Sequence, residues 1–412
     1  MKKIQSSAMY YALFLSVIFA LLLGGLILLS GFNQNFAIQM DIHNRLIDNA
    51  RSGVAYGQVN FQSLENDTPI DIRLFGEGID SVEITKKAWG AYTVIKANAY
   101  HLQQSATKIA FLGGKESEKL PNLYIADHGK PISLCGDARI EGMCFLPKSG
   151  LKRAYIEGKS YQGGKMIYGS VQDAEKHLPA IQSNVDLTET SAMEFAHWTN
   201  YEGDSIIRSF QDQGIHIVAD TYLSLTNEVV EGQVLITARD SIFVGKDAQL
   251  SNTILKAKVI HFEAGFKGTI QAFASERITV EEQVQLLYPS VLAITEKTFP
   301  QEQHALIEIR EQAQVLGTVF THSEQPNFRK LPLVRIAPEA RINGLVYSMG
   351  RTELKGTING HLYSQKLYLK TAASAYENHL LDGKILNELP ADFVFANLFT
   401  ETKQLKQLAW LM

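Results

Sequence analysis

The chain has 412 residues, 20% of them charged, and a formal net charge of −4 at pH 7. This length allows two or three domains with a sizeable core. The near balance of charge gives no sign of a polyanion partner through bulk electrostatics, and the absence of a basic stripe or stacking motif argues against nucleic-acid binding. The 16 tyrosines and 20 phenylalanines favour a strand-rich fold.

Residues 9–29 contain no charged side chain and read MYYALFLSVIFALLLGGLILL. A bilayer core requires about twenty apolar residues, so we predict a transmembrane helix that contacts lipid here. A cleaved signal peptide is the alternative. Its apolar region would be shorter, however, and Gly31-Phe32-Asn33 is a poor cleavage site. Residues 1–31 are therefore predicted to form a cytoplasmic tip and a retained anchor.

The distribution of positive charge predicts the orientation of this anchor. Lys2 and Lys3 precede the apolar run, and the next cationic residue is Arg45. The positive-inside rule then puts the N-terminus in the cytoplasm. We predict a single-pass protein of the inner (cytoplasmic) membrane of a Gram-negative-type envelope, with the bulk of the chain periplasmic.

Residues 32–57 carry apolar side chains at intervals of three and four, which predicts an amphipathic stalk helix that continues the anchor. The stripe consists of Phe32, Phe36, Met40, His43, Ile47, Ala50 and Val54. This start resembles the N-terminal segment of PilX-type minor pilins, which implies a hydrophobic helix leading into a β domain and a place in a pilus. The processing site of ordinary type IV pilins, Gly-Phe-Thr-x-x-Glu, is absent. The alternative is an anchor with an ordinary stalk.

Residues 58–120 alternate between apolar and polar side chains in three short runs, at 70–74, 81–85 and 91–97. Gaps containing Asp, Gly and Asn separate these runs, as turns require. The pattern predicts a small antiparallel β region that links the stalk to the rest of the chain.

One phrase is written twice near the C-terminal end, as INGLVYS at residues 342–348 and INGHLYS at residues 358–364. The offset of sixteen residues fits one turn of a β-solenoid, and short strands at high density favour this fold over a β-sandwich. We therefore predict a mainly β protein with a parallel β-solenoid (β-helix) over residues 121–370. A non-solenoid insertion is expected at about 171–213, and a C-terminal cap at 371–412 with a helix at 397–411.

The phrases around Gly317, Gly344 and Gly360, with their Thr-Val and Val-Tyr-Ser strands, resemble those of bactofilins and related polymer-forming β-solenoid proteins. The resemblance covers about 120 residues. It implies a structural role in which the chain assembles with itself or with partner proteins.

Enzyme chemistry on this fold would need residues that the pattern does not supply. A polysaccharide hydrolase needs converging carboxylates, but the strand acids occur singly. A hexapeptide acyltransferase needs a histidine base, and we interpret His216, His261 and His361 as surface or hydrogen-bonded residues. No metal or cofactor motif is present. No catalytic, cofactor-binding or metal-binding residues are therefore predicted, and no cofactor.

Two other pairs of residues are candidate sites. Tyr347 and Tyr363 occupy equivalent places in the repeated phrase, so they are expected to stack as an aromatic ladder on the outer surface, a feature that coil-to-coil packing alone would also produce. Cys135 and Cys144 would form a disulfide in an oxidising compartment. The interpretation that we favour is two small apolar residues in strands.

The sequence thus predicts a membrane-anchored, extracytoplasmic structural or assembly protein of the cell envelope, minor-pilin-like and without catalysis. Its partners would be the lipid bilayer, through residues 9–29, and other proteins or further copies of itself, but not nucleic acid. The alternative is a tethered β-helix protein that binds or modifies polysaccharide, as a carbohydrate-active enzyme of that fold would.

Overall fold

The computed structural model describes residues 7–75, 80–115, 120–181, 193–201, 205–296, 305–323, 330–400 and 404–411. The described chain is mainly β, with one long N-terminal helix, as predicted. It divides into two compact units. The first contains Met1–Tyr56, Pro69–Ile84 and Ala97–Lys108, and the second contains Gly57–Thr68, Thr85–Lys96 and Ile109–Met412.

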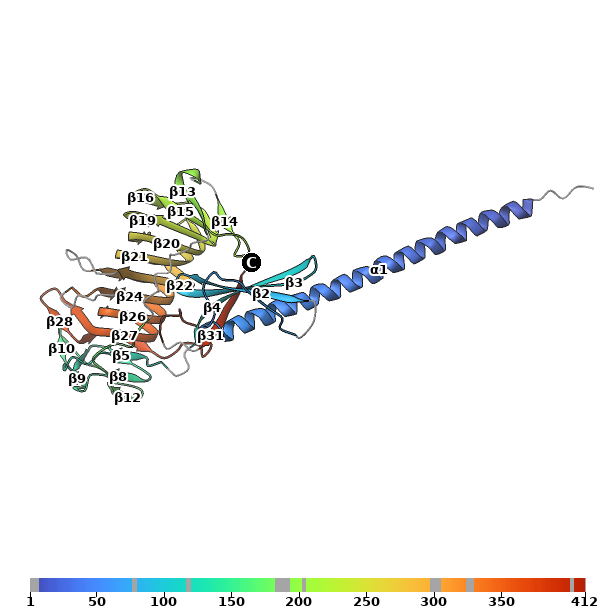
Figure 1. Cartoon of the computed structure of the whole chain (residues 1–412). Coiled ribbons are helices and arrows are strands. Elements are labelled where there is room, and N and C mark those ends of the chain that lie inside the picture. Colours follow the sequence, from blue (N-terminus) through green and yellow to red (C-terminus); the bar gives the residue numbers. More distant parts are fainter. Residues whose placement is uncertain are drawn as a thin grey trace, which may run out of the picture. The chain divides into compact units, whose positions relative to one another are not determined.

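Helix α1 (Ser7–Val59) is continuous over 53 residues, so the predicted anchor and stalk form one element (Figure 1). Its apolar part is long enough to cross a membrane, and none of that window is buried. The predicted stripe is only partly buried, because Phe32, Phe36 and Met40 are exposed whereas Ala50 and Val54 are buried. The helix backbone lies close to the side chain of Val82 at Gly53, because a Cβ atom at that position would be 2.6 Å from Val82.

The predicted antiparallel β region is confirmed, and it gains a strand from the C-terminal end. Its sheet has the order β1-β2-β3-β4-β31. The bounds are β1 (Ile70–Ile72), β2 (Ser81–Trp89), β3 (Tyr92–His101), β4 (Gln104–Lys115) and β31 (Gln404–Leu411). Strand β31 pairs antiparallel with β4, with Leu405 opposite Gly114. The helix expected at 397–411 is wrong over residues 404–411, which pair with β4 as a strand, and residues 401–403 lie outside the described part of the chain.

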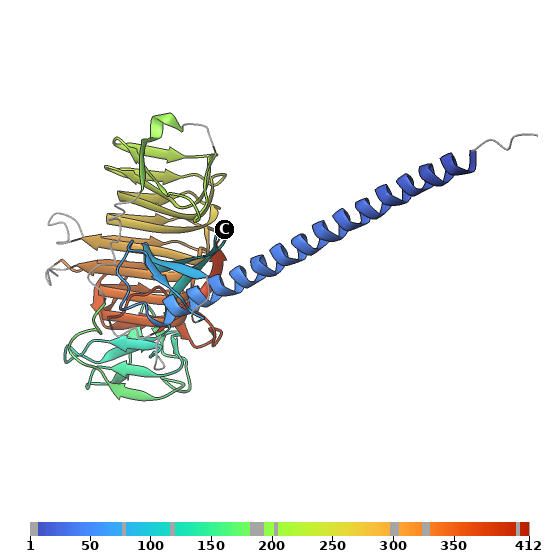
Figure 2. The ribbon, with the colours of Figure 1, turned by 45° about the vertical axis from the view of Figure 1, so that its right-hand side comes forward.

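The second unit is a stack of parallel strands whose pairings connect into one closed arrangement (Figures 1 and 2). The predicted register is confirmed in it, since Ile342 pairs with Ile358 and Tyr347 with Tyr363. The glycines of the phrase are required by this register. A Cβ atom on Gly344 (φ +147°) would lie 1.8 Å from the carbonyl oxygen of Gly317. Parallel turns can therefore approach at this corner only without a side chain.

The stack has three sides, which we name by their strands. One side, the covered face, contains the central parts of the long strands β20 (Gln249–Phe262), β21 (Lys267–Val280), β22 (Gln285–Glu296), β24 (Gln314–Ser323), β26 (Arg341–Leu354) and β27 (Thr357–Lys370), together with β5 (Leu123–Ile125), β8 (Cys144–Leu146), β12 (Val171–Asp173), β13 (Glu194–His197), β15 (Ile215–Ala219) and β18 (Val234–Ala238).

The second side, the open flank, contains the C-terminal parts of β20, β21, β26 and β27 with β16 (Tyr222–Leu225), β19 (Ser241–Val244), β23 (Leu306–Ile309) and β25 (Leu333–Ile336). The third side contains β7 (Arg139–Ile140), β14 (Ile206–Arg208), β17 (Val229–Gly232) and β30 (Lys384–Leu386) with the N-terminal parts of the long strands.

Shorter elements complete the unit. They are β6 (Ile132–Cys135), β9 (Leu151–Arg153), β10 (Tyr155–Ile156), β11 (Lys159–Ser160), β28 (Ala375–Glu377), β29 (His379–Leu381) and the single-turn helix η1 (Trp198–Asn200). Strands β6, β9 and β29 form a three-stranded parallel sheet, whereas β10 and β11 form an antiparallel pair.

The order of the layers differs from the order of the sequence. Strand β27 pairs with β26 on one side and with β5 on the other, where Leu362 lies opposite Leu123. The side-chain amide of Asn122 donates a hydrogen bond to the carbonyl of Gly360 at this junction, at 3.0 Å. The turns at residues 123–173 therefore lie beyond β27 at one end of the stack, and β13 lies at the other end (Figure 2).

This order corrects two predictions. Strands β12, β13 and β14 fall within residues 171–213 and are part of the stack. The segment expected to be an insertion therefore contributes strands at both ends of the stack. Strands of three or four residues are too short to show periodicity. The segment expected to be a cap, 371–412, does not end the stack either, because its strand β30 pairs with both β27 and β7 and its strand β31 pairs with β4.

Two large hydrophobic cores and a smaller cluster around Cys135 lie in the described part of this unit. The first fills the interior of the stack, with buried aliphatic residues from nearly every layer. The second covers the outer side of the covered face, where Trp89 and Tyr92 pack with Phe273 and Phe320. Gln271 fixes this contact, because its amide donates to the carbonyl of Trp89 at 2.9 Å and its oxygen accepts from the Ala91 N–H at 2.8 Å.

Candidate functional site

The predicted tyrosine ladder exists, but its rings are not on the surface. The ring centroids of Tyr347 and Tyr363 are 6.1 Å apart, and the column continues through Tyr124 and Phe145 at separations of 5.7 and 5.5 Å. Tyr347 is 3% exposed and Tyr363 is 1% exposed. The outer-surface prediction was therefore wrong, because other segments cover this face.

The covering segments are visible in the contacts of the ladder. The hydroxyl of Tyr347 donates to the carbonyl of Pro179 at 2.9 Å, and the ring of Phe399 contacts both Tyr347 and Tyr363. Burial raises the pKa of Tyr347 well above its ordinary value, with a further contribution from Tyr124. The ladder is a packing element of the second core.

Cys135 and Cys144 are free and buried, and no disulfide joins them. Cys135 packs with Ile156, Leu369 and Leu381, whereas Cys144 is part of the interior core. Burial raises the pKa of Cys144 to about 12, which makes this thiol a poor nucleophile near neutral pH.

The strand histidines have hydrogen-bonding or ring partners. The Nδ1 atom of His361 lies 2.9 Å from the carbonyl oxygen of Pro121, and burial lowers the pKa of this imidazole despite that hydrogen bond. The Nε2 atom of His216 lies 3.0 Å from the hydroxyl of Thr237. The ring of His261 stacks on Phe243 at 5.4 Å. Among the described residues, no group of three His, Cys, Asp or Glu could hold a metal ion.

The open flank carries a groove of about 460 Å³ that the sequence did not predict. Its polar lining comes from β23, β25 and β26, from the corners that follow them, and from the end of β27. The lining residues are Glu308, Ile309, Arg310, Glu311, Arg335, Ile336, Ala337, Pro338, Glu353, Lys355 and Lys370. We call this feature the charged groove.

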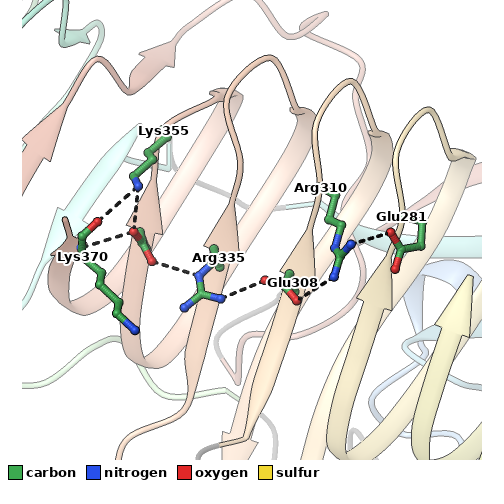
Figure 3. Close-up of polar contacts among 7 residues, drawn as sticks. Glu281, Glu308, Arg310, Arg335, Lys355 and Lys370 are labelled. Carbon is green, nitrogen blue, oxygen red and sulfur yellow. Dashed lines mark hydrogen bonds and ion pairs between the residues drawn. The ribbon is translucent and has the colours of Figure 1, made fainter. Parts of the chain in front are cut away.

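The core of the charged groove is a ladder of ion pairs that follows the strand register (Figure 3). Glu308, Arg335 and Glu353 are directly opposite one another in β23, β25 and β26. Arg335 bridges its two neighbours, with Nη1 at 2.8 Å from Glu308 and Nε at 3.0 Å from Glu353. Adjacent strands lie about 4.8 Å apart, so one guanidinium can reach both carboxylates.

Corner residues extend the ladder at both ends. Arg310 pairs with Glu281 at 2.9 Å and lies 3.9 Å from Glu308. Lys355 lies 3.3 Å from Glu353, and its ammonium also donates to the carbonyl of Lys370 at 3.3 Å. The backbone N–H of Lys370 donates to Glu353 at 3.2 Å.

Glu353 is the buried member of the ladder, since its side chain is 3% exposed. A carboxylate in that position needs partners, and it has two cations and a backbone N–H. Burial alone would lower the pKa of Arg335, but the hydrogen bonds from this guanidinium to Glu308 and Glu353 outweigh it and the net pKa is raised. The other members of the ladder are more exposed to solvent, so each of the pairs among them contributes little to stability.

The lining has one cation more than carboxylates, and Glu281, which pairs with Arg310 beside the lining, makes the two kinds of group equal in number. The lining contains four cations, Arg310, Arg335, Lys355 and Lys370, and three carboxylates, Glu308, Glu311 and Glu353. A guanidinium has five N–H donors, and the hydrogen bonds from Arg335 to Glu308 and Glu353 use two of them. The groove can therefore donate hydrogen bonds to an anionic group while its carboxylates accept them from hydroxyls.

Sequence reasoning missed this site because its members are far apart in the chain. Glu308 precedes Arg335 by 27 residues, and Arg335 precedes Glu353 by 18. One signal was available in the sequence. Glu308 and Arg335 are each the third residue of a four-residue strand, LIEI and LVRI, and Glu353 is the third residue of the last four in β26, RTEL. Unequal turn lengths hid this alignment, and the strand acids looked solitary.

A comparison with protein-family models, curated proteins and solved structures found no match to this chain. The resemblances to PilX-type minor pilins and to bactofilins therefore stay predictions that depend on the residues quoted for them.

Proposed function

We propose that this chain is a membrane-anchored structural protein of the cell envelope, in which the parallel layers form a β-solenoid that serves as a contact surface for partners. The observation that carries the proposal is the stack, in which successive turns pair in register over most of the second unit. Such solenoids present long regular faces, and extended binding surfaces are what stacked repeats provide.

The anchor helix indicates where in the cell envelope the protein is located. The apolar window of α1 has no buried residue, so a bilayer is the environment in which its side chains lose contact with water. Lys2 and Lys3 on the N-terminal side favour a cytoplasmic N-terminus and an extracytoplasmic stack. Minor-pilin-like and bactofilin-like roles are specific versions of this proposal.

The ends of the stack favour partner contacts along the sides. Tyr161 and Trp198 belong to the interior core near the two terminal strands, and Met166, Ile167 and Tyr201 pack against that core. Side chains that close a core leave less apolar surface for another copy to cover. Lateral contact through an exposed side is therefore the form of assembly that we propose.

The test uses the full chain. Removal of residues 9–29 is expected to move the protein from the membrane fraction to the soluble fraction, whereas the intact chain resists extraction by carbonate. A protease added to intact spheroplasts is expected to degrade the stack. Full protection of the stack would contradict the proposed orientation, and membrane retention of the deletion variant would contradict the anchor.

A further inference from the structure

We propose that the charged groove binds a linear polysaccharide that carries carboxylate groups. The inference goes beyond the structural role and does not depend on assembly. It requires only that the open flank is accessible to the polymer.

The paired cations of the groove are more exposed to solvent than the carboxylates that they contact. Glu353 is almost fully buried and already neutralised by Arg335 and Lys355. The side chains that a ligand meets include Arg310, which is 44% exposed, and Lys355, which is 35% exposed. The ammonium of Lys370 points away from the ladder (Figure 3). These cations keep N–H donors that suit a carboxylate.

Arg310 and Lys355 are spaced along the stack by its layers. Arg310, Ala337 and Lys355 occupy the same corner in three successive layers, because the N–H of Ala337 donates to Ile309 and that of Lys355 to Ile336. Arg310 and Lys355 are thus two layers apart, or about 10 Å. Ala337 lies between them and has only a methyl group, which leaves the space open. A polymer with regularly spaced carboxylates can contact both cations and lie over Ala337.

The column of side chains that contains Glu308 also carries aromatic ring surfaces. Going back through the layers from Glu308, the column contains Thr279, His261 and Phe243. The rings of His261 and Phe243 are parallel within 11° and half-buried. The face of an aromatic ring attracts the polarised C–H groups of a sugar ring. The column from Phe243 to Glu353 spans five layer steps, about 24 Å, which suits an extended chain rather than a single small ion.

The composition of the groove favours a polysaccharide over a protein. Protein interfaces usually centre on an apolar patch with aromatic anchors. Here Ile309 and Ile336 are buried, and the apolar surface left in the lining is that of Ala337 and Pro338. Carboxylates beside cations instead provide acceptors and donors for many hydroxyl groups, which is what a sugar polymer presents.

The experiment measures binding of the full chain, held in detergent micelles, to immobilised polygalacturonate. Dextran serves as a neutral polymer and poly-glutamate as a carboxylated polymer without sugar. We expect binding to polygalacturonate that weakens as salt rises, because exposed charges are screened. We expect no binding to dextran, and binding to poly-glutamate that is weaker by about tenfold or more.

Lys370→Gln is the cleanest variant, because the contacts of Lys370 with the ladder use its backbone atoms. We expect it to lower the affinity for polygalacturonate by about fivefold, and the double variant Arg310→Gln with Lys355→Gln to lower it further. The matched control is Lys267→Gln with Arg341→Gln, which removes two exposed cations from the third side. That control is expected to leave the affinity unchanged.

Three results would overturn the inference. They are the absence of binding to polygalacturonate, equal binding to poly-glutamate, or an equal loss in the control variant and in the groove variants. The melting temperature of each variant shows whether it folds, and Lys370→Gln keeps the test open if the double variant does not. Failure here would leave the membrane anchor untouched, since fractionation measures that separately.

Discussion

The covered face and the open flank of the stack share the long strands β20, β21, β26 and β27, yet the two sides differ in chemistry. Both place outward side chains in columns, one per layer, about 4.8 Å apart. On the covered face the column holds Tyr363, Tyr347 and Phe320, and other segments bury it. On the open flank the column holds Glu308, Arg335 and Glu353. The register aligns side chains into columns on both sides, and other segments bury the aromatic column of the covered face.

The difference shows what stabilises each side. Stacked rings remove a large apolar area from water, so exposing them by removing the segments that cover them lowers stability. An ionic ladder on an exposed side gains little from each pair and keeps the strands polar on the outside. The largest effects on stability are therefore expected at the interior corners and on the covered face, and the smaller ones on the open flank.

The largest effect is expected where the layers themselves approach. Gly344→Val would place side-chain atoms against the carbonyl of Gly317 and force a β-branched residue into φ +147°. We expect a loss of about 4 kcal/mol or more in the free energy of unfolding, measured by urea denaturation. Gly164→Ala is the control, because a Cβ atom at that position would have no neighbouring atom within 4 Å. A mild effect at Gly344 would contradict the register of β24, β26 and β27.

The aromatic column should be the next most sensitive. Tyr347→Ala removes a ring that is 3% exposed and packs against Tyr363 and Phe399, so we expect a loss of about 3–4 kcal/mol. Tyr368→Ala, near the C-terminal end of β27, should cost about 1 kcal/mol, because this ring is half-buried. Equal losses by urea denaturation would remove the distinction between the two sides.

The ionic ladder should respond at its buried member. Arg335→Gln leaves Glu353 with Lys355 and the N–H of Lys370 as partners, and we expect a loss of about 2 kcal/mol. Glu311→Gln, an exposed residue of the same groove, should change the free energy of unfolding by less than about 0.5 kcal/mol. Thermal denaturation that ranks these two variants in the opposite order would show that Glu353 does not depend on Arg335.

Alkaline pH is expected to have the smallest of these effects on the free energy of unfolding, through buried tyrosine side chains. Burial raises the pKa of Tyr347, and it raises that of Tyr288 to about 12. A raised folded-state pKa contributes stability that is complete below the unfolded value of about 10 and is lost as pH rises through the folded value. Above about pH 10, we expect the free energy of unfolding to decline with rising pH less steeply in Tyr347→Phe than in the wild type. The same decline in wild type and variant would contradict a role for Tyr347.

The sequence was informative where neighbouring turns repeat. The phrase at residues 342–348 and 358–364 predicted the pairing of β26 with β27, and the uncharged run at 9–29 predicted a helix. The order of the turns could not be predicted in this way. Asn122 and Gly360 are 238 residues apart, and no shared phrase connects the turns that they join.

The exposure of the columns could not be predicted either. Nothing in the phrase around Tyr347 indicates that Pro179 and Phe399 cover it, because those segments have no periodic pattern. The strand β31 shows the same limit, since its apolar residues fit a helix until Leu405 is placed opposite Gly114. Contacts made by irregular segments depend on tertiary packing, which overrides local preference.

The position of β27 inside the stack is the central structural claim, and hydrogen exchange of the full chain tests it most directly. The N–H of Leu362 donates to the carbonyl of Asn122 at 2.9 Å, and the N–H of Ala126 donates to Ser364 at 3.2 Å. We expect the amide of Leu362 to be protected as strongly as that of Val346, because both lie in layers with a neighbour on each side. Rapid exchange at Leu362 with slow exchange at Val346 would make β27 an end strand and contradict the layer order.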